Sequence, residues 1–154
     1  MKRSLIALSA VLLSVSTLAQ VSVKDAWVRA TVAQQKATGA FMQLQSAQDA
    51  KLVGAQSPVA GVVEVHEMAM EAGVMKMRAV PTLALPAGKA IELKPGGYHV
   101  MLMDLKGQVK DGDTVPVTLV VEGKDGKHQN IEVRATARGM NPPPMQHKHG
   151  NHPH

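Results

Sequence analysis

The sequence predicts an all-β domain, a Greek-key sandwich or barrel, on three observations. Apolar and polar residues alternate in short segments, as they do on strands with one buried face. Turn residues recur about every eight to twelve positions, a spacing typical of sandwiches and barrels. No segment shows the 3.6-residue period of a helix. A chain of 154 residues is long enough for one such domain.

The first five predicted strands are separated by polar residues or glycine. The first contains Trp27, and the second contains Phe41 and Met42 as expected core residues. The third is interrupted by glycine, and residues 71–73 join the fourth and fifth as a hairpin. These strands span residues 21–31, 37–46, 51–58, 62–70 and 74–80.

The remaining predicted strands follow proline- and glycine-rich connections. Pro81, Pro86 and Gly88 mark a loop, and a Pro-Gly-Gly turn at 95–97 comes next. Further turns are Asp-Gly-Asp at 111–113 and Lys-Asp-Gly at 124–126. The strands between and after these connections span residues 90–94, 98–106, 114–123 and 128–138.

The two ends of the chain differ from the domain at 20–138. Residues 1–19 are expected to be a secretory signal peptide, because two basic residues precede an apolar run too short for a membrane span. Cleavage is expected before Gln20, which leaves an exported protein without a membrane anchor. Residues 139–154 are rich in Pro, His and Met and have too few aliphatic residues for a core, so a disordered tail is expected.

Composition excludes several functions. The formal net charge is only +5, and one Trp, one Tyr and one Phe give no platform for stacking nucleic-acid bases. The absence of Cys excludes disulfides, a blue-copper thiolate site and lipid attachment through cysteine. No nucleophile–base constellation stands out, so the chain is not expected to be an enzyme.

Histidine and methionine alternate in three predicted strands. A period of two places such residues on one face, so thioether and imidazole groups from neighbouring strands can meet. Sulfur and nitrogen donors without thiolate suit Cu(I). The alternative is that methionine only fills the core. The residues are His66, Met68, Met70, Met75, Met77, His99, Met101 and Met103.

The tail carries a second set of candidate ligands. Imidazoles spaced by one or two residues suit Cu(II), and zinc remains an alternative. An expression tag or a plain solvated tail is the other interpretation. The candidates are Met140, Met145, His147, His149, His152 and His154.

The spacing of four donors resembles the signature of a known family. Ten residues separate His66 from Met77, twenty-one separate Met77 from His99, and one separates His99 from Met101. With DAWVR at 25–29, GAFMQL at 39–44, LVGAQSP at 52–58, HEM at 66–68 and HVMLMDLK at 99–106, residues 21–122 resemble the PCu(A)C periplasmic copper chaperones.

This resemblance implies a cupredoxin-like or immunoglobulin-like sandwich in the periplasm. It implies one Cu(I) held by His66, Met77, His99 and Met101, with Met68 as an auxiliary ligand and the other alternating methionines packed beside the site. It also implies Cu(II) binding by the tail. The expected recipients are the cytochrome c oxidase subunit that carries the copper-A centre, or a Sco-type copper protein, and the chaperone is expected to be a monomer.

Two alternatives to delivery remain open: copper buffering without a dedicated recipient, and a non-metal exported interaction module. The hairpin register also remains open. A two-residue loop at Glu71 and Ala72 would set His66 opposite Met77 on one face. A bulge at Gly73 would shift the pairing by one residue and turn Met77 away.

Overall fold

The computed structural model describes residues 20–139. These residues form ten strands and no helix, so the all-β prediction is confirmed. None of their segments is therefore a helix long and apolar enough to cross a bilayer. The strands are β1 (Val21–Arg29), β2 (Ala37–Ser46), β3 (Ala50–Gln56), β4 (Ala60–Glu71), β5 (Val74–Ala79), β6 (Leu83–Leu85), β7 (Ala90–Leu93), β8 (Tyr98–Leu105), β9 (Thr114–Gly123) and β10 (His128–Arg138).

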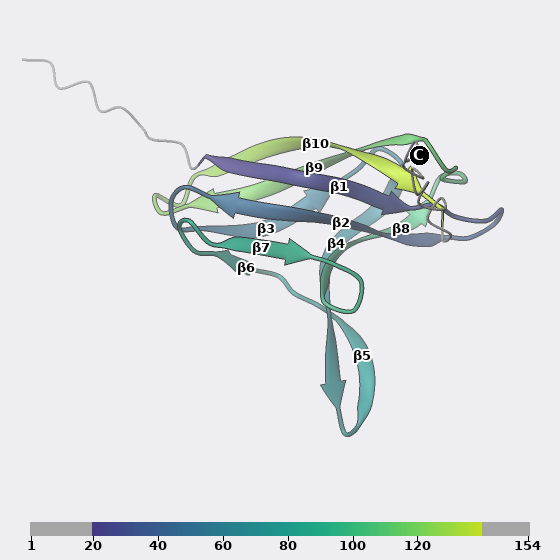
Figure 1. Ribbon diagram of the computed structural model, residues 1–154, viewed down its shortest axis with the longest axis horizontal. Helices are drawn as coiled ribbons and strands as arrows, with labels where there is room; N and C mark the ends of the chain where they lie inside the picture. The colour runs from purple at the N-terminus through teal and green to yellow at the C-terminus, as the bar shows by residue number, and fades with distance from the viewer. Residues whose placement is uncertain (1–19, 140–154) are drawn as a thin grey trace, which may run out of the picture.

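The strands join in one continuous, curled sheet. Its order is β5-β4-β8-β2-β1-β10-β9-β3-β6, with β7 paired to the second half of β2. The pairing of β1 with β10 is parallel. Although β3 and β4 are far apart in this order, they contact each other, because the sheet wraps around a common core (Figure 1).

The core is aliphatic and draws on most of the strands. Met42 is only 2% exposed, which confirms its predicted core position. Phe41 is also buried but points to the other side of β2, since consecutive strand residues alternate between faces. The fully buried large side chains include Leu44, Leu52, Leu85, Leu93, Leu102 and Leu119.

The strand β6 was expected to be part of a loop. It has three residues, and it pairs with β3 so that Leu85 lies opposite Ala50. Both of its leucines are buried. The alternation of a three-residue strand next to prolines is too short to be recognised in the sequence.

The β4–β5 hairpin projects from the body of the sandwich (Figure 1). Every residue of β5 is exposed. Glu71 pairs with Val74, so the turn residues are Ala72 and Gly73, with φ of 49° and 79°. Positive φ at both positions is typical of a type I′ turn, which matches the twist of the strands that it joins.

The resulting register differs from both predicted alternatives. Met68 lies opposite Met77, and His66 lies opposite Ala79. Compared with the register that pairs His66 with Met77, the strands are displaced by two residues. A displacement by an even number keeps every side chain on its face, so Met77 stays on the His66 face.

Candidate metal centre

The pairing of β4 with β8 brings the two candidate histidines together. His66 lies directly opposite His99, and the centroids of their rings are 6.0 Å apart. Met101 lies opposite Glu64, which makes it a diagonal neighbour of His66. Met77 is diagonal to His66 on the other side, across from Met68. Long side chains reach diagonal neighbours on a sheet. The donors around His66 are therefore His99, Met101, Met77 and, two residues along its own strand, Met68.

Burial of alternate residues decides which face carries the donors. Val100 and Leu102 on β8 are completely buried, so His99 and Met101 point away from the core. On β4, Val65 faces the core and His66 faces outward. The same alternation places all eight candidates on one face: His66, Met68, Met70, Met75, Met77, His99, Met101 and Met103.

Each imidazole has one nitrogen engaged and one free. The Nε2 of His66 lies 2.8 Å from the Glu64 carboxylate, and the Nδ1 of His99 lies 3.0 Å from the Gly97 carbonyl. Carboxylate and carbonyl oxygens accept hydrogen bonds here, so these ring nitrogens are the donors.

The remaining ring nitrogens are His66 Nδ1 and His99 Nε2. Both are buried, and neither has a hydrogen-bond partner among the described residues. Buried polar atoms are almost always paired, which makes two neighbouring exceptions informative. A ring that donates from one nitrogen and offers the lone pair of the other is the usual arrangement of a metal-ligating histidine.

The site is closed at its imidazole end and open at its thioether end. His99 is 5% exposed, whereas Met77 is 46% exposed. Met101 and Met68 are half-buried. The Gly97 carbonyl joins the two parts, because it accepts hydrogen bonds from both the His99 ring and the Met68 backbone. The hairpin is therefore anchored at the histidine pair and exposed beyond it.

The other face of the hairpin is polar. Arg78 contacts Glu67 at 2.6 Å, and Lys76 lies 3.6 Å from Glu71. The hydrogen bond from Arg78 to Glu67 raises the pKa of this arginine, which therefore stays charged. These pairs bridge β4 and β5, and they leave the methionines on a face of their own.

An aromatic row adjoins the imidazole end. The Phe41 ring lies 6.2 Å from His99 and 4.5 Å from Trp27, and the Arg138 guanidinium lies 5.7 Å from the Trp27 ring. Gly39 lies two residues before Phe41 on the same face of β2, and its lack of a side chain leaves room for the Phe41 ring. Phe41 is buried, as the sequence predicted, and its ring borders the site.

Several other candidates lie elsewhere. His128 is exposed beside Glu122 at the start of β10, far along that strand from Arg138. The tail candidates at 140–154 and the signal peptide at 1–19 lie outside the described residues. Within residues 20–139, no cluster of three or more His, Cys, Asp or Glu could hold a metal ion.

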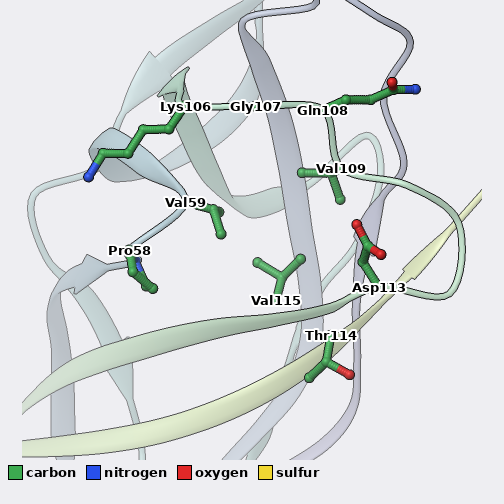
Figure 2. Close-up of a pocket in the computed structure, with 9 residues that line it drawn as sticks. All are labelled: Pro58, Val59, Lys106, Gly107, Gln108, Val109, Asp113, Thr114 and Val115. Atoms are coloured by element: carbon green, nitrogen blue, oxygen red, sulfur yellow. The ribbon is translucent and has the colours of Figure 1, made fainter.

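The cavity in Figure 2 is separate from the histidine pair. It has a volume of about 360 Å³ and lies between the β3–β4 connection and the loop before β9. Val59, Val109 and Val115 converge on it, while the Lys106 ammonium points away (Figure 2). Neither His nor Met lines it, so it offers none of the proposed donors.

Solved structures place this fold in a known class. The solution structure of CuI-DR1885 from Deinococcus radiodurans has a TM-score of 0.56 and 36% identity, over 75% of this chain and 76% of that chain. The apo PCuAC domain from PmoF1 has a TM-score of 0.62 and 25% identity, and the match covers 77% of this chain and 93% of that domain. The copper-bound PCuAC domain from PmoF2, with a TM-score of 0.61 and 22% identity over 77% and 92%, shares the fold. The resemblance to PCuAC proteins is confirmed.

Sequence comparison gives the family. A family model described as "Putative lipoprotein LpqE-like" matches residues 21–135, and the chain belongs to this family. The putative lipoprotein Lxx21020 of Leifsonia xyli subsp. xyli is 34% identical over 100 residues, 64% of this chain and 60% of that protein. The uncharacterized protein RP573 of Rickettsia prowazekii is 32% identical over 84 residues, 54% of this chain and 46% of that protein.

The chain therefore spans less than two thirds of the length of these curated relatives. One chemical difference from the family description is clear. The 154 residues contain no Cys, so this sequence offers no thiol for lipid attachment.

The packing of Phe41 can be tested at Gly39. A Cβ added at Gly39 would lie 2.9 Å from Phe41 Cζ, so Gly39→Ala is expected to displace this ring. Trp27 packs on Phe41 and is the only tryptophan, so its fluorescence emission should shift. Gly54→Ala is the matched control, because a Cβ there makes an ordinary contact of 3.8 Å with Val120. Equal spectra for both variants would contradict this packing.

Proposed function

We propose that this chain is a copper chaperone that holds one Cu(I) through His66, Met77, His99 and Met101. Met68 is the auxiliary ligand, since it lies opposite Met77 and next to His66 on its strand face. The observation that carries the proposal is the pair of buried, unpartnered ring nitrogens beside outward-facing thioethers. Copper is the cargo of such a protein, and no substrate is turned over.

The donor set selects the oxidation state of the metal. Two thioethers and two imidazoles are neutral, so bound Cu(I) keeps a net charge of +1. Soft sulfur favours Cu(I), whereas Cu(II) prefers nitrogen and oxygen. Half of the Met77 side chain is open to solvent, which gives a partner access to the metal from the thioether side. Ligand exchange from that side would release copper without unfolding the domain.

The proposed setting is the periplasm, after export by the signal peptide at 1–19. A family of putative lipoproteins and the presence of an apolar N-terminal run support export. The proposed recipient is the cytochrome c oxidase subunit with the copper-A centre, or a Sco-type copper protein, and the chaperone acts as a monomer. This recipient follows from the resemblance to PCuAC proteins.

We also propose that the tail binds Cu(II) and passes copper to the folded site after reduction. Support comes from where the domain ends. The Arg138 guanidinium lies over Trp27, and the row continues through Phe41 to His99 in steps of 4.5 and 6.2 Å. A tail of fifteen residues after Gly139 is attached on the side of the site. Tethering raises the local concentration of its imidazoles there and favours intramolecular transfer.

The ligand assignment is tested by Met77→Leu combined with Met101→Leu. Leucine keeps nearly the same volume, so the domain should stay folded while Cu(I) affinity falls by more than about 100-fold. Competition with a chromophoric Cu(I) chelator measures the affinity, and circular dichroism checks the fold. Met75→Leu is the matched control on the same hairpin face and should bind like the wild type. Undiminished binding by the double variant would refute the assignment.

The role of the tail is tested by ending the chain at Gly139. The shortened protein should keep Cu(I) binding and lose most Cu(II) binding. In the full chain loaded with Cu(II), reduction should produce sulfur ligation in X-ray absorption spectra. If the shortened protein takes up as much Cu(II) as the full chain, the tail has no part in copper capture.

Delivery is tested in cells with limited copper. A strain without this protein should lose cytochrome c oxidase activity, and the wild-type gene should restore it, whereas the Met77→Leu, Met101→Leu gene should not. Addition of excess copper should restore activity without the chaperone. Normal oxidase activity in the deletion strain, together with greater sensitivity to copper, would instead identify a buffering protein.

A further inference from the structure

We propose that Glu64 is a positioning residue of the metal site, which fixes the ring nitrogen that His66 presents. The inference rests on the proposed function of this site. Glu64 and His66 are two residues apart on β4 and share a face. Glu64 Oε2 lies 2.8 Å from His66 Nε2, within the range of a strong charge-assisted hydrogen bond.

This contact decides the tautomer of His66. A carboxylate can only accept a hydrogen bond, so Nε2 carries the proton and Nδ1 keeps its lone pair. His66 Nδ1 is the buried atom without a partner. Without Glu64, nothing described around this ring holds the proton on Nε2, and the two neutral tautomers would interconvert. Only one of them offers Nδ1 to a metal ion.

The tautomer of the second histidine, His99, is set by a backbone atom. His99 Nδ1 donates to the backbone carbonyl of Gly97, which leaves Nε2 free. The two rings therefore present unlike nitrogens, Nδ1 from His66 and Nε2 from His99. Because the partner of His99 is a backbone atom, a side-chain substitution cannot remove it. A substitution at Glu64 can therefore change which ring nitrogen His66 presents.

Glu64 also brings a negative charge close to the bound cation. Its side chain is 48% exposed, so it stays hydrated on one side. It lies directly opposite Met101, another proposed ligand. Orientation of the ring and neutralisation of charge are separable effects: Glu64→Gln keeps an acceptor oxygen and removes the charge, whereas Glu64→Leu removes both.

The neighbouring strand residue Glu67 provides a matched control. It is on the opposite face of β4, where its carboxylate binds Arg78 at 2.6 Å. Glu67→Gln removes a carboxylate from the same strand and weakens an ion pair of the hairpin without touching His66. If lost charge or a loosened hairpin by itself lowered Cu(I) affinity, Glu67→Gln would lower it too.

The experiment measures the His66 tautomer in the metal-free protein by long-range ¹⁵N–¹H NMR, and Cu(I) affinity by competition. We expect the Nε2–H tautomer in the wild type, in Glu64→Gln and in Glu67→Gln. Glu64→Leu should show mixed tautomers and bind Cu(I) about 10- to 100-fold more weakly, the usual effect of removing an outer-shell partner. Glu64→Gln should retain most of the affinity.

Three results would overturn the proposal. They are an Nδ1–H tautomer in the wild type, an unchanged tautomer in Glu64→Leu, and a loss of affinity in Glu64→Gln despite a retained tautomer, which would assign the effect to charge. The NMR measurement needs no copper. If the wild type binds no Cu(I), the proposed function fails, while the tautomers still decide what Glu64 does to His66.

Discussion

The register of β4 against β8 is the constraint on which the candidate site depends. Val65 lies opposite Val100, and Val63 lies opposite Leu102, with these side chains packed in or against the core. A shift of one residue would turn the valines to solvent and the histidines into the core. The aliphatic core, rather than any interaction between donors, therefore sets His66 opposite His99. A protein built this way keeps its imidazoles in place whether or not metal is bound.

The second register, of β5 on β4, is held by weaker forces. All of β5 is exposed, so burial does not penalise a shift there. The turn at Ala72 and Gly73 and the ion pair of Arg78 with Glu67 are what align the strands. Exposed segments with few buried contacts open more readily than the core does. The contrast suits the proposed carrier, in which fixed imidazoles would retain the metal and the thioethers of an exposed hairpin would admit the group that accepts it.

The sequence predicted every strand except β6, and the shared face of the donors, because both depend on a period of two. It did not predict the hairpin register, since Ala72 gives no signal for the left-handed conformation that it adopts at φ 49°. Burial of Phe41 was foreseen, but not its side, which requires knowing that Met42 faces the core. Nothing in the sequence distinguishes Glu64, because an isolated glutamate on a strand is normally solvated. The role proposed for it depends on the contact with His66, which only the folded chain shows.

The two free ring nitrogens also have an energetic consequence. A buried polar atom without a partner destabilises a fold by about 1–3 kcal/mol. His66 Nδ1 and His99 Nε2 are adjacent cases, and the rings cannot turn to relieve them without breaking the bonds to Glu64 and Gly97. The two unpaired nitrogens therefore destabilise the metal-free domain locally, and the packing of the surrounding core offsets this destabilisation. A cation bound by both rings would remove that cost, so part of the free energy of the proposed metal binding would come from ring positions that the fold sets beforehand.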